Sequence, residues 1–183
     1  MNASGERLDI DTMLEHRSLT SEDQDQLWEW FHLSLWDPPP AAPRPRTVLQ
    51  NPEVRVYAEG WGRDGDVGVV GIVDEVEIGA CWMRPLLAEV GLAWVDEQTP
   101  QLGIAVLPRH RRLGYGTRLL QAALAAASHA GFHQVSLTVH PANPAITLYE
   151  RCGFAKRGLR RGFHLMIYDE GSRAGFHSLA GAQ

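Results

Sequence analysis

The chain is poor in several features that would assign it to a familiar class. Only two cysteines occur, Cys81 and Cys152, and no secretory hydrophobic segment precedes them, so we expect free thiols in a cytoplasmic protein. No apolar run approaches the roughly 20 residues of a membrane-spanning helix, so no membrane partner is expected. The formal net charge is -5, which argues against the broadly basic surface of a nucleic-acid-binding protein.

The remaining composition is that of one soluble globular domain. With 183 residues, 44% of them hydrophobic and 21% charged, the chain is long enough to bury a full core. The sequence contains no internal repeat and no sign of a second domain. We expect one domain over residues 11–170, preceded by a disordered polar stretch at 1–10 and followed by a disordered Gly/Ser/Ala-rich tail at 171–183.

Hydrophobic periodicity and turn residues predict an α+β domain. The order of elements indicates a mixed, mostly antiparallel sheet of about six to seven strands, flanked by about four helices in α/β/α layers. One parallel pair, 101–107 with 134–140, is joined by a crossover helix. The predicted helices run from Thr20 to about Trp36, from Asn51 to about Gly60, and over 114–130 and 144–152. The predicted strands are 12–19, 67–73, 76–83, 90–95, 101–107, 134–140, 154–159 and 163–169.

The most informative segment is LGIAVLPRHRRLGYGTRLL, residues 102–120. An apolar strand leads into a turn rich in Gly and Arg and then directly into a helix. Such a turn presents free backbone N–H groups at the positive end of the helix dipole. Arg109, Arg111 and Arg112 add positive charge where a helix start disfavours it. This combination indicates an anionic partner, a phosphate or a pyrophosphate.

Spacing argues against two common phosphate-binding loops. The nucleoside-triphosphate loop requires a Gly-Lys pair, and the chain contains none. Gly114 and Gly116 supply the first two glycines of the dinucleotide-binding fingerprint, but Leu119 stands at the third position. The pattern that remains is R-x-x-G-x-G at Arg111, Gly114 and Gly116.

A second motif, VSLTVHPANPAITLYERCGF at 135–154, follows after one helix. Asn143 suits a helix N-cap, Pro144 the first helical position, and Gly153 the helix end. Together the two motifs resemble the coenzyme A loop and the N-x-x-A-x-x-L-Y-E-x-x-G-F segment of the GNAT superfamily of N-acetyltransferases, here with Asn, Pro and Ala adjacent. The likeness extends to most of the chain and is strongest to a bacterial subgroup of unassigned substrate.

The resemblance implies where acetyl-CoA would bind. The two parallel strands would splay at their carboxyl ends and hold the pantetheine arm between them. Backbone amides of the loop, with the Arg111 and Arg112 side chains, would hold the pyrophosphate, and the strand end would hold the pantetheine amide and the acetyl carbonyl. The residues expected to contact the cofactor are Ala105, Val106, Leu107, Arg111, Arg112, Leu113, Gly114, Tyr115, Gly116, Thr117, Asn143 and Tyr149.

Three residues are candidates for catalysis: Tyr149, His140 and Gln101. Tyr149 is the candidate general acid, because a phenol with a pKa near 10 remains protonated while a thiol with a pKa near 8.5 departs. Gln101 stands where many GNAT enzymes carry Glu, and an amide cannot accept a proton at neutral pH. The base is therefore left open between His140, Asp96, Glu97, water, and an acceptor amine of lower pKa.

The predicted function is acetyl-CoA-dependent transfer of an acetyl group directly to a primary amine of a small molecule or peptide. Two alternatives remain: transfer of another acyl group from CoA, and a non-catalytic CoA-binding sensor or interaction module, which Gln101 favours. No metal is expected, since His129 and His133 flank a predicted helix end and lack a third ligand. The Trp-rich first helix fits core packing, a wall of an acceptor pocket, or a homodimer contact.

Overall fold

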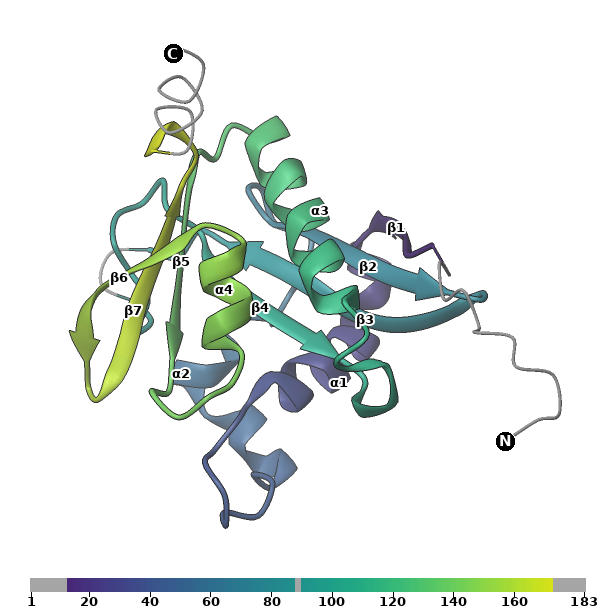
Figure 1. The fold of residues 1–183 in the computed structure, drawn as a ribbon, viewed down its shortest axis with the longest axis horizontal. Coiled ribbons are helices and arrows are strands. Elements are labelled where there is room, and N and C mark those ends of the chain that lie inside the picture. The colour runs from purple at the N-terminus through teal and green to yellow at the C-terminus, as the bar shows by residue number, and fades with distance from the viewer. Residues whose placement is uncertain (1–12, 88–89, 173–183) are drawn as a thin grey trace, which may run out of the picture.

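A seven-stranded sheet forms the centre of the protein in the computed structural model, which describes residues 13–87 and 90–172. Figure 1 shows the strands in the order β1-β2-β3-β4-β5-β7-β6. Neighbouring strands are antiparallel except β4 and β5, so the predicted mixed sheet with one parallel pair is confirmed. The strands are β1 (Glu15–Ser18), β2 (Val67–Val73), β3 (Val76–Arg84), β4 (Gln101–Val106), β5 (Gln134–Val139), β6 (Phe154–Arg160) and β7 (Phe163–Asp169).

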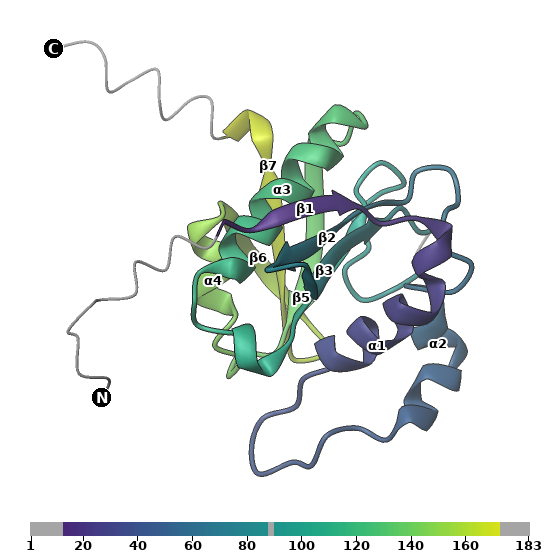
Figure 2. The same ribbon diagram turned by 90° about the vertical axis from the view of Figure 1, so that its right-hand side faces the viewer.

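Helices cover both faces of this sheet. Figure 2 shows α1 and α2 on one side of the strands and α3 and α4 on the other. The α-helices in the described residues are α1 (Gln24–Ser34), α2 (Pro52–Arg55), α3 (Tyr115–His129) and α4 (Ile146–Arg151). Short 3₁₀ segments are Ser21–Asp23, Arg46–Gln50 and Pro108–His110. None of the helices in the described part of the chain is long and apolar enough to cross a lipid bilayer.

The core lies on both faces of the sheet because side chains alternate along β2 and β3. Val69 and Cys81 pack under α3 and α4. Their neighbours Val70 and Trp82 point to the opposite face and pack under α1. Helix α3 is amphipathic and buries Leu119, Leu120, Ala123, Leu124 and Ala127. Each leucine buried in this way stabilises the fold by about 1.5–3 kcal/mol.

The predicted strand at 90–95 is wrong, because this segment forms turns instead. Gly91 has a φ of +85°, which breaks an extended conformation. The backbone groups that a strand would use bind side chains from other elements. The Leu92 N–H donates to the Tyr57 hydroxyl at 3.2 Å, and Arg160 donates to the Leu92 carbonyl at 3.2 Å. Because of these bonds, the segment packs against the sheet through side chains and does not pair with it as an edge strand.

Several helix boundaries also differ from the prediction. Helix α1 ends at Ser34, because Leu35 is extended, so Trp36 lies outside the helix. Helix α2 is only four residues long, although Asn51 caps it as expected by accepting from the Glu53 N–H at 3.0 Å. Asn143 is not the N-cap of α4. The N-cap is Ala145, and the Asn143 side chain closes the turn just before the helix by accepting from the Ala145 N–H at 2.9 Å.

The predicted disordered ends, 1–10 and 171–183, lie outside the described residues except for Gly171 and Ser172.

Candidate coenzyme and acceptor site

A row of unused backbone donors lies where β4 passes into α3. Gly114, with a φ of +83°, is the N-cap of α3, and the helix begins at Tyr115. Within the described residues, the backbone N–H groups of 112–116 donate no hydrogen bond. These five consecutive amides lie at the positive end of a fifteen-residue helix. An anion with several oxygens matches this arrangement.

The same loop concentrates positive charge around the amides. Arg109, Arg111 and Arg112 are all exposed. The Arg111 Nε donates to the Val106 carbonyl at 2.7 Å, which holds this side chain against the end of β4. The partial burial of its guanidinium lowers the pKa of Arg111. An arginine remains charged at neutral pH, so the loop offers both fixed amides and a fixed cation.

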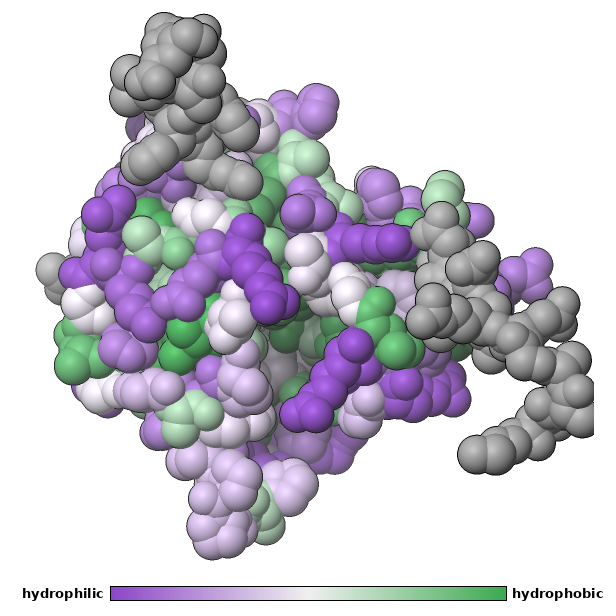
Figure 3. Space-filling view, in the orientation of Figure 1, coloured by the Kyte–Doolittle hydropathy of each residue, from purple (hydrophilic) through white to green (hydrophobic). Residues whose placement is uncertain are grey.

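Gly116 lies where a side chain would face both β4 and α4. A methyl group added there would lie 3.6 Å from Leu148 Cδ2 and 3.9 Å from Val106 Cγ2. A larger side chain would therefore stand between the strand and the helix. Figure 3 shows the surface hollowed between α4 and the start of α3, with hydrophobic side chains at the bottom. The hollow is of the kind that a narrow arm attached to a phosphate group could enter.

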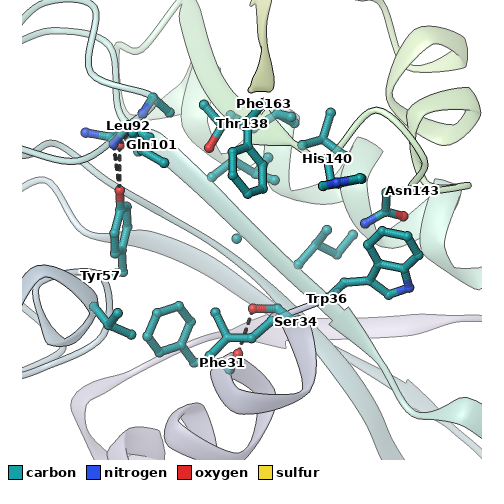
Figure 4. A pocket seen from close by; sticks show the side chains of 18 of the residues that line it. Phe31, Ser34, Trp36, Tyr57, Leu92, Gln101, Thr138, His140, Asn143 and Phe163 are labelled. Atoms are coloured by element: carbon teal, nitrogen blue, oxygen red, sulfur yellow. Dashed lines mark hydrogen bonds between the residues drawn. The ribbon is translucent and has the colours of Figure 1, made fainter. Parts of the chain in front are cut away.

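The two parallel strands, β4 and β5, separate toward their carboxyl ends. Cα pairing of β4 with β5 is limited to Gln101 and Ser136, and the Ser136 N–H also donates to the Pro100 carbonyl at 3.0 Å. A cavity of about 250 Å³ lies along the separated strands. Figure 4 shows side chains from both strands, from the end of α1 and from the segment after α2 around it. The splay that the resemblance implied is therefore present.

Tyr149 reaches this cavity from α4. Its ring packs edge-on against Phe154 with 5.9 Å between centroids. Its hydroxyl makes no hydrogen bond to another described residue, although the side chain is buried. Burial, with a smaller contribution from the nearby Cys81, raises the pKa of Tyr149 well above its usual range. The hydroxyl therefore carries its proton throughout the physiological range.

Comparison with known proteins assigns this arrangement to a family. The model of the acetyltransferase (GNAT) family matches residues 19–154, more than half of the chain. The chain belongs to the GNAT family of acetyltransferases. This membership supports acyl transfer as the general activity, and the family uses acetyl-CoA.

Solved GNAT structures share the fold at low sequence identity. The GNAT domain of PAT from S. lividans aligns at a TM-score of 0.62 with 18% identity, covering 85% of this chain and 90% of its own. The paia N-acetyltransferase from Thermoplasma acidophilum, determined in complex with coenzyme A, aligns at a TM-score of 0.58 with 16% identity, and the alignment covers 86% of this chain and 99% of that protein. A ribosomal-protein-alanine N-acetyltransferase from Brucella melitensis aligns at a TM-score of 0.59 with 19% identity, covering 84% of this chain and 97% of that protein. At these identities the likeness establishes the fold alone.

In this GNAT protein, Gln101 lines the cavity, and both the oxygen and the nitrogen of its side-chain amide are hydrogen-bonded. Its Oε1 accepts from the Tyr57 hydroxyl at 3.2 Å and from the Ala93 N–H at 3.2 Å (Figure 4). Its Nε2 donates to the Val90 carbonyl at 2.7 Å. The residue is 2% exposed. Gln101 therefore ties the 90–93 segment to the sheet.

His140 lies at the opposite side of the cavity, between two rings. The Trp36 and Phe163 centroids are each 5.7 Å from its ring. The Ala142 N–H donates to His140 Nδ1 at 3.1 Å. Because a backbone N–H is always a donor, the basic lone pair of the neutral ring is already used, and Nε2 carries the proton. In this arrangement His140 offers a donor rather than a base.

The other two candidate bases do not reach the cavity. Asp96 and Glu97 are exposed, and neither lines it. The Asp96 carboxylate instead accepts from the Gln98 N–H at 2.9 Å and closes a local turn. The structure therefore argues against both as the proton acceptor.

The cavity wall includes residues that were not singled out from the sequence as site residues, among them Trp36, Arg44, Tyr57 and Phe163. Trp36 and Arg44 belong to the loop after α1, Tyr57 follows α2, and Phe163 begins β7. Arg44 is paired with Asp37 through two bonds of 2.6 Å. This pairing lowers the pKa of Asp37 and keeps it charged. Only the abundance of tryptophan around α1, which suggested a pocket wall as one alternative, pointed toward this region.

Proposed function

We propose that this GNAT protein transfers an acetyl group from acetyl-CoA directly to a primary amine of a small molecule or peptide. The observation that carries the proposal is the row of unused amides at 112–116 beside Arg111. Hydrogen bonds from a charged partner contribute about 1.5–3 kcal/mol each. A diphosphate could accept several at once, so the loop would hold the coenzyme mainly through its backbone.

The position of Tyr149 in the cavity supports a role for this residue in the transfer step. The neutral amine nitrogen would attack the acetyl carbon, the bond from that carbon to sulfur would break, and Tyr149 would give its hydroxyl proton to the departing sulfur. The proton that the nitrogen loses as the amide forms would return to the Tyr149 oxygen, directly or through water, so that CoA leaves as the thiol and the tyrosine is restored. The side chain is suited to this task because it lines the cavity, keeps its proton, and has no competing hydrogen-bond partner in the described residues. The backbone groups around Ala105, Val106 and Leu107 that make no other bond would align the pantetheine arm and the acetyl carbonyl. The Leu107 N–H is not one of them, because it donates to the Ile78 carbonyl at 2.8 Å.

A direct transfer is favoured over an acetyl-cysteine intermediate. Cys81 and Cys152 are both buried. Burial raises the pKa of the Cys81 thiol well above its usual range. The thiolate is the nucleophilic form of cysteine, so a buried thiol of high pKa is a poor nucleophile.

One observation favours the alternative of a CoA-binding sensor. Both polar atoms of the Gln101 side chain are hydrogen-bonded to the protein, and no carboxylate lines the cavity among the described residues. An enzyme of this design would need an acceptor that loses its proton to water, or one that is already neutral.

Calorimetry and a thiol-release assay test the proposal and separate it from the alternative. Acetyl-CoA should bind with measurable heat, and S-acetylpantetheine, which lacks the diphosphate, should bind at least about 10-fold more weakly. Release of free thiol should then depend on an added primary amine. Absence of heat with folded protein would overturn the proposal. Binding without turnover for any amine would support the sensor instead.

A further inference from the structure

Several aromatic rings line the acceptor side of the cavity. Phe31 lies between two of them, with its centroid 6.1 Å from that of Tyr57 and 6.0 Å from that of Trp82. A second group consists of Trp36, His140 and Phe163. In Figure 4, Phe31 and Tyr57 lie on one side of the space and Trp36 and His140 on the other. A flat apolar group between them would meet ring surfaces on both sides.

The same cavity offers no negative charge to a cationic ligand. Among the described residues that line it, none is Asp or Glu. Its one arginine, Arg44, is already matched by Asp37. A second ammonium group on the ligand would lose its hydration and gain no counter-charge, which is strongly unfavourable.

Several polar groups around the cavity are already hydrogen-bonded within the protein. The Ser34 hydroxyl donates to the Phe31 carbonyl at 2.7 Å, and Tyr57 and Gln101 bind each other and the 90–93 segment. Polar groups of Thr138, His140, Asn143 and Tyr149 remain for a ligand. A ligand with more hydroxyl or amino groups than these can serve would leave some of its own hydrogen bonds unmade.

We propose, on the basis of the function proposed above, that the acceptor is a primary amine that carries an aromatic ring and no second cationic group. The size of the cavity agrees. An engineered cavity of about 150 Å³ holds benzene. The volume here is about 250 Å³, part of which the acetyl end of the coenzyme would occupy, so the remainder has room for about one ring beside the amine. Polyamines and other ligands with several cationic groups are disfavoured.

A matched set of amines tests the inference directly. The probes are 2-phenylethylamine, the same molecule with an aminomethyl group on the ring, propylamine and spermidine. We expect kcat/KM for 2-phenylethylamine to exceed the value for each of the other three by roughly 10- to 100-fold, from burial of the ring and the absence of a second charge. The same order should appear in binding measured by calorimetry in the presence of CoA. A preference for spermidine or the diamine would overturn the inference.

Two pairs of variants locate the effect in the cavity. Trp36→Ala should lower kcat/KM for 2-phenylethylamine by roughly 10-fold without changing the affinity for acetyl-CoA. Trp28→Ala is the control, because Trp28 belongs to α1 but does not line the cavity. Thr138→Asp should shift the preference toward the diamine by roughly 10-fold, and Thr138→Asn should not. Equal effects within either pair would contradict the inference.

These results also distinguish the two proposals from each other. If amines are acetylated but the aromatic monoamine is not preferred, the proposed function stands and the inference about the acceptor fails. If acetyl-CoA binds but no amine gives thiol release, the proposed function fails. The binding order measured with CoA present would then still decide which amine the cavity prefers.

Discussion

The loop proposed to bind the coenzyme and the cavity proposed to bind the acceptor are built by different means. The loop is one continuous stretch, residues 107–118, whose binding groups are backbone amides. The cavity draws its side chains from α1, from the segment after α2, and from β3, β4, β5 and β7. The loop is cationic, whereas the described cavity wall combines one paired arginine with aromatic rings.

The difference concerns how far each region depends on individual side chains. A binding site made of backbone amides depends little on which side chains the loop carries. A wall of side chains changes with each substitution. We infer that acceptor choice resides in the long-range contacts around the cavity.

The largest expected effect is a loss of stability on replacing Arg84, which holds the segment that carries Tyr57 in place. Arg84 is 1% exposed and pairs with Asp66 at 2.7 and 2.6 Å. It also donates to the Val56 and Glu59 carbonyls at 3.0 and 2.8 Å, which holds the segment that carries Tyr57. Arg84→Ala should lower the free energy of unfolding by about 3–5 kcal/mol, because it leaves a buried carboxylate unpaired.

Urea unfolding measures the effect of Arg84→Ala. The control is Arg157→Ala, since Arg157 is an exposed residue of β6 and its removal should change stability by no more than about 0.5 kcal/mol. Similar small changes in both variants would show that the anchor is not needed.

Removal of the candidate acid should affect rate and not binding. Tyr149→Phe should reduce kcat about 100-fold and leave the Kd for acetyl-CoA within about 2-fold. Single-turnover kinetics and calorimetry measure the two quantities. Tyr168→Phe serves as the control, because Tyr168 packs against the same Phe154 ring but does not line the cavity. Equal loss of rate and affinity would assign Tyr149 to the structure of the loop rather than to the chemistry.

Gln101→Glu tests whether a carboxylate at this position restores a base. We expect a loss of about 2 kcal/mol in the free energy of unfolding and no gain in rate. The reason is that a carboxylate oxygen would replace the amide that donates to the Val90 carbonyl at 2.7 Å. Gln98→Glu, at an exposed position, is the control in chemical denaturation and in steady-state assays. A faster reaction with unchanged stability would refute this account.

The smallest effect concerns the loop itself. Arg111→Ala should weaken acetyl-CoA binding about 10-fold, because one charge-assisted contact is lost while the backbone amides remain. Binding of S-acetylpantetheine should not change. Calorimetry with both ligands measures the difference, and equal weakening of the two would place Arg111 at the pantetheine arm.

Local features were predicted well because local physics produces them. The strand at 163–169, the helix start at Gly114 and the helix end at Gly153 follow from periodicity and from glycine conformations. The segment 90–95 has the apolar composition of a strand, but its hydrogen bonds go to Tyr57, Gln101 and Arg160. No local pattern reveals partners that lie 8 to 68 residues away.

The difference between local and long-range contacts also explains which catalytic candidates could be assessed from the sequence. Tyr149 belongs to a motif and could be singled out from its neighbours in the sequence. His140 could also be identified by position, but the direction of its lone pair depends on the Ala142 amide. Asp96 and Glu97 lie near Gln101 in the sequence, yet the turn at 96–98 keeps them outside the cavity.

The amino-acid sequence alone indicated most of the strands and helices, and the glycines and arginines that gather at the start of α3. Both depend on residues within one helical turn or one strand of each other, and on backbone groups that every residue carries. Only the tertiary structure decided that the described cavity wall brings several aromatic rings together and includes no carboxylate. That property arises from side chains more than a hundred residues apart, and burial sets their hydrogen bonds and charges only once the sheet has assembled.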